Sequence, residues 1–289
     1  VGRVPQGRKA GPVDVDQTSG NLSRNLPEPL WQRTREAARL LRRARHAVAL
    51  TGAGISTPSG VPDFRSPETG LWRHADPLLV ASIWTFRVSP QRFFDWMRPL
   101  ARTLLEAKPN PAHEALARLE EAGLLQAIIT QNIDGLHQKA GSRTVLELHG
   151  HIRTATCTRC YRTYPSDVFI PAYLDTGAVP RCGCGGLLKP DVILLGEDLP
   201  RETYLQAVRE ARTCDLMLVA GTSLEVAPAS ELPFIAQRRG VPVIVVNLDP
   251  TPLDPLAAVV LHADVALILP ALAALVLSPE GASGEPGAA

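Results

Sequence analysis

The chain has 289 residues, of which 45% are hydrophobic and 20% are charged, and its formal net charge at pH 7 is +1. A chain of this length can bury one large core, or a main domain with a smaller insert. The near-neutral charge excludes a bulk electrostatic attraction to nucleic acid, and no apolar run approaches the ~20 residues that span a bilayer. We therefore predict neither direct nucleic-acid recognition nor a membrane partner. Because the N-terminus lacks the apolar core of a secretory signal, we expect a cytoplasmic location.

Both ends of the chain are predicted to be disordered. Residues 1–25 mix glycine, proline, serine and charged residues without an apolar period, and residues 278–289 are mostly glycine, alanine, serine and proline. Between the two ends, residues 33–45 have the apolar spacing of an amphipathic helix. This helix leads to the apolar run 47–51, which we predict to be a strand that ends at a glycine turn.

Further short apolar runs predict further strands, at residues 124–130, 144–148, 216–221 and 241–247. Strands that are apolar throughout suit a parallel sheet covered on both faces. We therefore predict an α/β fold with a Rossmann-like open parallel sheet and helices on both faces. Ligands of such sheets lie outside the carboxyl ends of the strands. Here four of these ends carry glycine or polar residues, in the segments Gly52-Ala53-Gly54, Gln131-Asn132-Ile133-Asp134, Gly221-Thr222-Ser223 and Asn247-Leu248-Asp249.

The first glycine turn continues through Ser56 into residues 59–65, where Asp63, Phe64 and Arg65 follow a proline. Glycine after a strand lets the backbone approach a pyrophosphate closely, although such turns are also ordinary strand-to-helix links. The prolines and the glycine nearby make this segment a poor helix. We therefore interpret it as a loop that can close over a ligand.

A single histidine, His149, stands between Leu148 and Gly150 directly after a predicted strand. Imidazole is the side chain that titrates near neutral pH without much tuning, so His149 is the best candidate for a general base. His151 lies two positions later and is the alternative, whereas His137 is predicted to be structural.

Four of the five cysteines form two close pairs, Cys157 with Cys160 and Cys182 with Cys184, separated by 21 residues. In a reducing compartment such pairs hold metal more often than they form disulfides. The spacing predicts one structural zinc ion with four thiolate ligands, against redox thiols or a degraded site as alternatives. The fifth, Cys214, is predicted to be a small core residue in a strand over 213–220.

Taken in this order along one chain, these segments resemble the sirtuins, the NAD-dependent protein-lysine deacylases. The resemblance spans about residues 26–275. It implies that NAD is a co-substrate, and that the partner is an acyl-lysine protein or peptide. The domain division that it implies is a Rossmann-like NAD-binding domain at 26–151 and 191–277, with a cofactor loop and helical module at 58–105 and a zinc-ribbon domain at 152–190.

The resemblance also implies roles for single residues. Phe64 would shield the reacting ribose carbon, and Asp134 would bind the carboxamide of nicotinamide. The catalytic pair would be His149, as general base, and Asn132, which positions the ribose and a water. The residues implied to contact NAD are Gly52, Ala53, Gly54, Ser56, Asp63, Phe64, Arg65, Gln131, Asn132, Ile133, Asp134, His149, Gly221, Thr222, Ser223, Asn247, Leu248, Asp249 and Val265.

By the same resemblance, the substrate peptide would add as a strand between residues 189–197 and 223–227 through main-chain hydrogen bonds. The residues implied to contact it are Val192, Ile193, Leu195, Gly196, Glu197, Leu224, Glu225 and Val226. Desuccinylase-type sirtuins carry tyrosine and arginine where the predicted helix 90–99 and its continuation place Met97 and Leu100. An apolar pair cannot bind a carboxylate, so an acetyl or a longer uncharged acyl group is expected, unless Arg98 or Arg102 takes part.

The reaction implied is an attack of the substrate carbonyl oxygen on the anomeric carbon as nicotinamide leaves, after which His149 deprotonates a ribose hydroxyl. The products would be free lysine, nicotinamide and O-acyl-ADP-ribose. Two other interpretations stay open, a protein mono-ADP-ribosyltransferase and a non-catalytic NAD-binding scaffold. The completeness of the loop and the histidine argues against the scaffold, because a binding module needs no general base.

Overall fold

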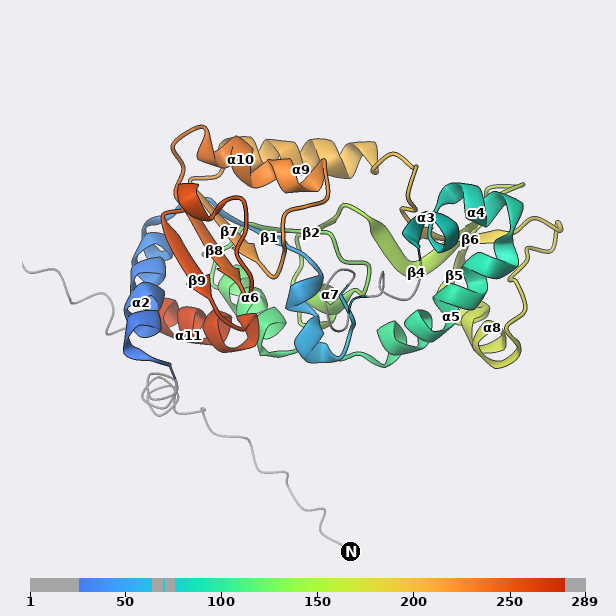
Figure 1. Cartoon of the computed structure of the whole chain (residues 1–289), viewed down its shortest axis with the longest axis horizontal. Helices are drawn as coiled ribbons and strands as arrows, with labels where there is room; N and C mark the ends of the chain where they lie inside the picture. The colour runs from blue at the N-terminus through green and yellow to red at the C-terminus, as the bar shows by residue number, and fades with distance from the viewer. Residues whose placement is uncertain (1–25, 64–69, 71–75, 279–289) are drawn as a thin grey trace, which may run out of the picture.

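The computed structural model describes residues 26–63, 70 and 76–278. Its centre is a six-stranded sheet in the order β3-β2-β1-β7-β8-β9, and every neighbouring pair is parallel (Figure 1). The predicted open parallel sheet is therefore confirmed. In chain order, its strands are β1 (Ala47–Thr51), β2 (Ala127–Thr130), β3 (Val145–Glu147), β7 (Leu216–Ala220), β8 (Val243–Asn247) and β9 (Val259–His262).

The four central strands are buried at every position, which explains why their sequences are apolar without alternation. Two of them begin later than predicted. Leu124 and Val241 instead donate their backbone N–H groups to the ends of the preceding helices, at Leu119 and Ala236. Cys214 is buried as predicted, but it ends a helix and does not lie in the strand.

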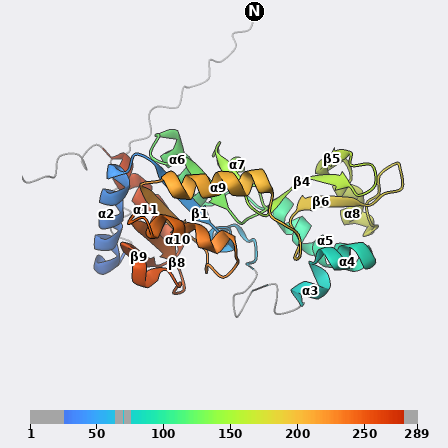
Figure 2. The ribbon, with the colours of Figure 1, turned by 90° about the horizontal axis from the view of Figure 1, so that it is seen from above.

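Helices cover both faces of this sheet (Figures 1 and 2). One face carries α2 (Glu28–Arg43), α6 (Pro111–Glu121) and α11 (Val265–Leu277), and the other carries α9 (Arg201–Thr213) and α10 (Leu232–Gln237). Helix α2 buries Thr34, Ala37, Ala38 and Leu41, the i, i+3, i+4, i+7 stripe of an amphipathic helix. It starts five residues before the predicted start at residue 33.

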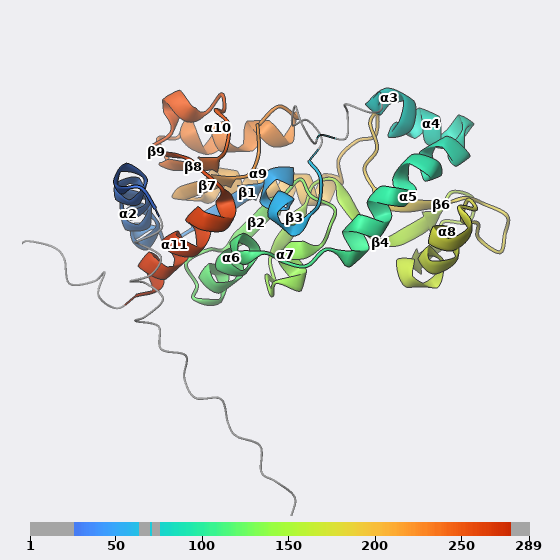
Figure 3. The same cartoon turned by 60° about the horizontal axis from the view of Figure 1, so that its bottom comes forward.

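A second, antiparallel sheet in the order β5-β4-β6 lies at one end of the molecule (Figure 3). Its strands are β4 (Gly150–Cys157), β5 (Thr163–Pro165) and β6 (Leu188–Val192). Beside them lie α3 (Pro77–Val80), α4 (Ile83–Val88), α5 (Pro90–Glu106) and α8 (Ile170–Thr176). A cluster that includes Phe86, Phe93, Phe94 and Tyr173 packs α4, α5 and α8 together. The domain boundaries drawn from the sequence stay predictions.

The chain order of the main sheet places its switch point between β1 and β7. From β1 the chain builds outward through β2 and β3, and then it returns to the other side of β1 to build β7, β8 and β9. A crevice forms at such a point, outside the carboxyl ends of the strands. No helix in the described ranges has both the length and the apolar character needed to cross a membrane. The predicted disorder of residues 1–25 and 279–289 lies outside the described residues, whereas Ser278 ends α11.

Candidate functional site

The turns that follow β1 and β7 pack backbone against backbone. The Gly54 N–H donates to the Gly221 carbonyl at 2.9 Å, and the Gly52 N–H donates to Ala220 at 3.3 Å. A Cβ atom on Gly221 would lie 2.3 Å from the nitrogen of Ile55, and Gly221 has a positive φ of 61°. Only glycine fits there. The result is a cradle of closely packed glycine backbone at the switch point, which suits the pyrophosphate of a dinucleotide.

Ser56 holds the centre of a buried polar network beside this cradle. Its hydroxyl donates to Asp134 Oδ2 at 2.7 Å, and it accepts from Asn132 Nδ2 at 3.0 Å. Asn132 Nδ2 also donates to the Gly52 carbonyl at 3.1 Å, while the Leu136 N–H donates to Asp134 Oδ1 at 2.8 Å. Burial raises the pKa of Asp134, and the hydrogen bonds from Leu136 and Ser56 oppose that rise. The glycine turn, the amide and the carboxyl group are thus fixed as one unit.

Two buried histidines, His113 and His137, lie next to this network, and their ring centroids are 4.9 Å apart. His113 Nδ1 accepts from the Asn110 N–H at 3.3 Å, so its Nε2–H faces the Ser56 hydroxyl at 3.4 Å. His137 Nε2 lies 2.9 Å from Thr51 Oγ1. Burial lowers the pKa of His113 to about 4 and that of His137 to about 3. Both imidazoles are therefore neutral at pH 7, which supports a structural role for His137.

His149 lies between the two sheets, after β3 and directly before β4. Its Nδ1 is 2.8 Å from the carbonyl of Gln131, so Nδ1 carries the proton and Nε2 is left as a base. Burial lowers its pKa, and the hydrogen bond to Gln131 opposes that shift. His149 is consequently neutral at pH 7 and can accept a proton without first losing one. The alternative, His151, has a buried Nδ1 without a partner among the described residues.

A cavity of about 440 Å³ joins these groups. Of the predicted NAD and catalytic residues, it is lined by Ala53, Ser56, Gln131, Asn132, Ile133, Asp134 and His149. Of the predicted substrate residues, it is lined by Val192, Ile193, Leu195, Glu197 and Val226. Residues from two separate sequence regions thus share one space, which is the arrangement that a two-substrate reaction requires.

Other predicted site residues lie outside this cavity. Gln131 Nε2 donates to Thr222 Oγ1 at 3.0 Å, which connects the cavity to the turn after β7. Asn247 Nδ2 donates to the Asp249 carbonyl at 2.8 Å and shapes the turn after β8, where Leu248 is 65% exposed. The cavity lining also lacks Gly52, Gly54, Asp63, Gly196, Gly221, Ser223, Leu224 and Glu225, although the glycine turns adjoin it.

Phe64, Arg65 and Val265 complete the set of predicted NAD residues. Phe64 and Arg65 lie outside the described residues. Val265 is 4% exposed and starts α11 within the main hydrophobic core. Its side chain is thus engaged in packing and offers almost no surface for the predicted contact with NAD. That contact stays a prediction.

Helix α5 forms one wall of the cavity. Met97, Leu100 and Leu104 line it, and no lysine or arginine is among its described lining residues. Arg98 points elsewhere, because its guanidinium donates to the carbonyls of Leu174 and Asp175 at the end of α8, at 2.6 to 3.0 Å.

Arg102 reaches the Leu174 carbonyl at 3.3 Å. Both arginines close to the wall in sequence are therefore used to fasten α8 to α5.

A model described as the Sir2 family matches residues 52–228 of the chain. The chain is also 47% identical over 238 residues to the NAD-dependent protein deacylase 2 of Archaeoglobus fulgidus, over 82% of this chain and 93% of that relative. This chain belongs to the Sir2 family.

Two further matches extend the likeness of this Sir2 protein to known relatives. It is 46% identical over 219 residues to the NAD-dependent protein deacetylase 1 of Geobacillus kaustophilus, over 76% of this chain and 88% of that relative. The solved structure of Sir2Af2 bound to a myristoylated histone peptide matches it with a TM-score of 0.73 and 40% identity, over 85% of this chain and 96% of that chain.

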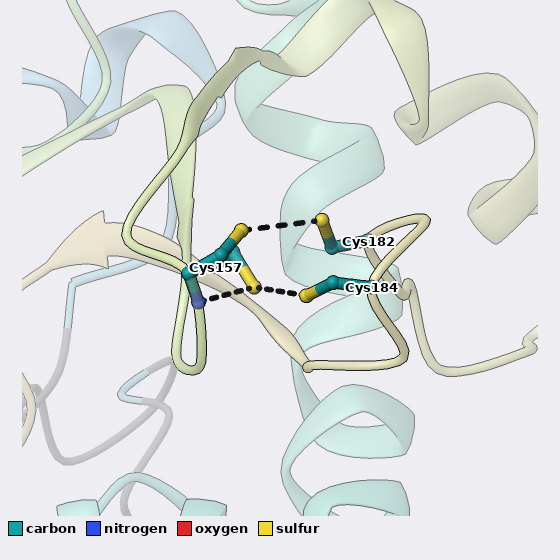
Figure 4. Close-up of side chains that lie close together, drawn as sticks. Cys157, Cys182 and Cys184 are labelled. Atoms are coloured by element: carbon teal, nitrogen blue, oxygen red, sulfur yellow. Dashed lines mark hydrogen bonds between the residues drawn. The ribbon is translucent and has the colours of Figure 1, made fainter.

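The four paired cysteines of this Sir2 protein lie at the end of β4 and in the loops next to the small sheet. Their Sγ atoms all lie within 4.8 Å of one another, with 3.5 Å between Cys157 and Cys184 and 3.6 Å between Cys160 and Cys182. Figure 4 shows Cys182 and Cys184 pointing from one loop toward Cys157. Zinc–sulfur bonds of ~2.3 Å in a tetrahedron require sulfur separations of about 3.8 Å. The tetrad therefore fits one zinc ion, and because all four ligands are cysteines, that ion is structural.

Several lining residues were not predicted from the sequence. Pro77, Ala81, Trp96, Leu104 and Leu199 line the cavity of this Sir2 protein. They are apolar and come from scattered segments, so no local pattern distinguishes them from core residues. His113 does have a local signal, because it follows Asn110 by three residues in a capping box at the start of α6. That signal predicts a helix start and says nothing of the contact with Ser56.

Proposed function

We propose that this chain is an NAD-dependent protein-lysine deacylase that releases nicotinamide and O-acyl-ADP-ribose. The observation that carries this proposal is the single cavity that joins the neutral His149 to the Ser56–Asn132–Asp134 network and to an apolar wall. The printed names of the relatives, an NAD-dependent protein deacylase and an NAD-dependent protein deacetylase, support the same activity. No observation favours the mono-ADP-ribosyltransferase or the scaffold.

The residues divide the chemistry between them. When bound, NAD supplies the ribose carbon to which the acyl oxygen bonds as nicotinamide leaves. Asp134 and the backbone near it would accept hydrogen bonds from the carboxamide. Both amide hydrogens of Asn132 are engaged by Gly52 and Ser56, so its oxygen is left to accept a bond from a ribose hydroxyl or a water. His149 Nε2 would take the ribose proton, while the Gln131 carbonyl holds the ring in the required tautomer.

We infer that the acyl group is uncharged. Met97 and Leu100 present methyl and methylene groups to the cavity, and the nearby Arg98 and Arg102 are committed to α8. A carboxylate buried against such a wall would lose its hydration without gaining a partner. An acetyl group or a longer uncharged acyl group is compatible with this apolar wall, to which Trp96 and Leu104 also belong. The cytoplasmic location expected from the sequence stays a prediction.

The proposal is tested by mass spectrometry of an acetyl-lysine peptide incubated with the zinc-loaded protein, with and without NAD. The expected result is loss of the acetyl group only with NAD, together with nicotinamide and O-acetyl-ADP-ribose. His149→Ala should abolish it, and His151→Ala is the matched control, because it removes a histidine two positions away that does not line the cavity. An unmodified acetyl peptide, with longer acyl peptides also unchanged, would refute the proposal.

The acyl preference is tested with acetyl, butyryl, octanoyl and succinyl versions of one peptide. The three uncharged peptides should react and the succinyl peptide should not. Leu100→Arg places a cation on the wall and should lower the rate with octanoyl-lysine by about tenfold or more, because the buried apolar contact is replaced by a charge. Equal rates with succinyl and butyryl peptides in the wild-type protein would contradict the inference.

A further inference from the structure

Lys189 and Glu197 form an ion pair beside the cavity that the reaction itself does not use. Lys189 lies on β6, Glu197 lies five residues beyond the end of that strand, and their Nζ and Oε2 atoms are 2.9 Å apart. Their side chains are only 17% and 24% exposed. Glu197 lines the cavity, whereas Lys189 is not one of the lining residues. A pair this sheltered differs from a solvated surface pair, whose contribution is small.

Each charge of this pair also binds backbone between the two residues. Lys189 Nζ donates to the Val192 carbonyl at 2.8 Å, and Glu197 Oε2 accepts from the Leu194 N–H at 2.9 Å. The Glu197 N–H donates back to the Leu194 carbonyl at 3.0 Å. The chain leaves β6 after Val192, so the polar backbone groups of the residues that follow need other partners. The ion pair supplies two of them, and charge-assisted bonds of this kind are stronger than neutral ones.

The same segment connects the parts of the site. The Ile193 N–H donates to the carbonyl of His149 at 2.8 Å. On its other side, the Leu195 N–H donates to the Ala81 carbonyl and the Leu195 carbonyl accepts from the Ile83 N–H, both at 3.0 Å. Segment 192–197 therefore touches the base on one side and the start of α4 on the other. The conformation of this segment therefore sets the position of the cavity wall relative to His149 and to α4.

We propose that Lys189 and Glu197 are positioning residues that fix segment 192–197 as the wall against which the acyl-lysine binds. Neither residue takes part in the bond changes. Loss of the pair leaves one sheltered charge without its partner and frees the backbone of Leu194 or Val192. The wall then shifts at Leu194 to Glu197. The His149 ring keeps its bond to the Gln131 carbonyl, and the NAD cradle, which is built by the β1 and β7 turns, stays in place. The proposal rests on the proposed deacylase function, because it concerns the binding of that substrate.

The test is steady-state kinetics of Lys189→Met, with NAD and acetyl peptide varied separately, alongside anisotropy of a labelled acetyl peptide. Lys189→Met should raise the peptide KM and the peptide Kd by about tenfold or more, because a buried charge loses its partner. The KM for NAD and kcat should stay within about threefold of wild type, as expected for a change in substrate binding alone. Lys189→Arg keeps the charge and should restore the peptide KM. Lys108→Met, an exposed lysine far from the pair in sequence, is the matched control.

Glu197→Gln gives a second route in case Lys189→Met does not fold. The amide oxygen can still accept from Leu194, so the peptide KM should rise in the same direction but by less. An unchanged peptide KM in both variants would overturn the proposal. Equal changes in the two KM values and kcat would do so too, because they indicate a general structural role. A wild-type protein that deacylates no peptide would instead refute the proposed function, which separates the two failures.

Discussion

The buried histidine pair makes the fold sensitive to acid, and the size of this effect follows from its surroundings. His113 and His137 are held neutral, with pKa values lowered by burial to about 4 and about 3. In the unfolded chain both titrate near the ordinary value of 6.5. Between that value and the folded pKa values, the unfolded state binds more protons, so stability falls as pH falls. Above 6.5 neither state is protonated, and the penalty vanishes.

At pH 5 each histidine stands 1.5 units below its unfolded pKa while the folded protein still binds no proton. The penalty is then about 2 kcal/mol for each ring, or about 4 kcal/mol for the pair, at 1.36 kcal/mol per unit. This is a large share of the 5–15 kcal/mol typical of a folded domain. Asp134 has a raised pKa and contributes with the opposite sign in acid, so a comparison of variants is needed to isolate the histidines.

His137→Gln is the variant of choice, because the glutamine amide can still donate to Thr51. Urea denaturation at pH 7 and pH 5 gives the loss of stability for each protein. The variant should lose about 2 kcal/mol less between the two pH values than the wild-type protein does, because one of the two proton-binding sites of the unfolded state is gone. Any zinc release in acid affects both proteins alike. Identical losses in the two proteins would refute the assignment of this acid sensitivity to His137.

Three further predictions concern the base, the glycine that begins β4 and the metal. Burial lowers the pKa of His149, and the neutral ring is the active form. The acidic limb of the kcat/KM profile should therefore lie below pH 6.5. A limb above pH 7 in a pH–rate profile would contradict this. For Gly150, at φ 72°, a Cβ would lie 2.1 Å from the Asp191 carbonyl, whereas Gly123, at φ 74°, has nothing within 4 Å. Gly150→Ala should therefore lower the melting temperature and kcat much more than Gly123→Ala, whose cost is only the ~1 kcal/mol of a left-handed alanine. For the metal, Cys182→Ser should reduce the zinc content, measured by elemental analysis, and destabilise the small sheet, measured by thermal melting. The control variant Cys214→Ser should keep one zinc ion per chain.

Sequence patterns predicted the main sheet well because its central strands are buried on both faces. A strand such as β7 has no polar position, so it stands out from every amphipathic helix. β9 was not predicted, and its burial alternates, as expected for the outer strand of a sheet. The start of α2 was placed too late because its first turn, from Glu28, contains Pro29 and has no fully buried residue, so it precedes the buried stripe that begins at Thr34.

The polar members of the site could be predicted because they lie in short motifs next to strand ends. Ser56, Asn132 and Asp134 are examples, and one network joins them in the structure. The apolar wall that α5 contributes to the cavity was harder to predict. Met97 and Leu100 were placed by register alone, and the sequence left Arg98 open as a ligand for a charged acyl group. Its actual partners are backbone carbonyls 76 and 77 residues away, and no local pattern encodes a contact of that range.

His149 occupies the junction between the two sheets, and this position explains how one residue can serve two substrates. β3 ends two residues before it, and β4 begins directly after it. Its ring is held by the carbonyl of Gln131, at the end of β2, while its own carbonyl is held by Ile193, in the segment that follows β6. The first bond ties the base to the sheet that cradles the dinucleotide. The second ties it to the wall that faces the acyl-lysine, so the base is fixed relative to both substrates at once. A base on either sheet alone would depend on the packing between the sheets for its alignment, and misplacement of a reacting group by about 1 Å can cost 10²-fold in rate.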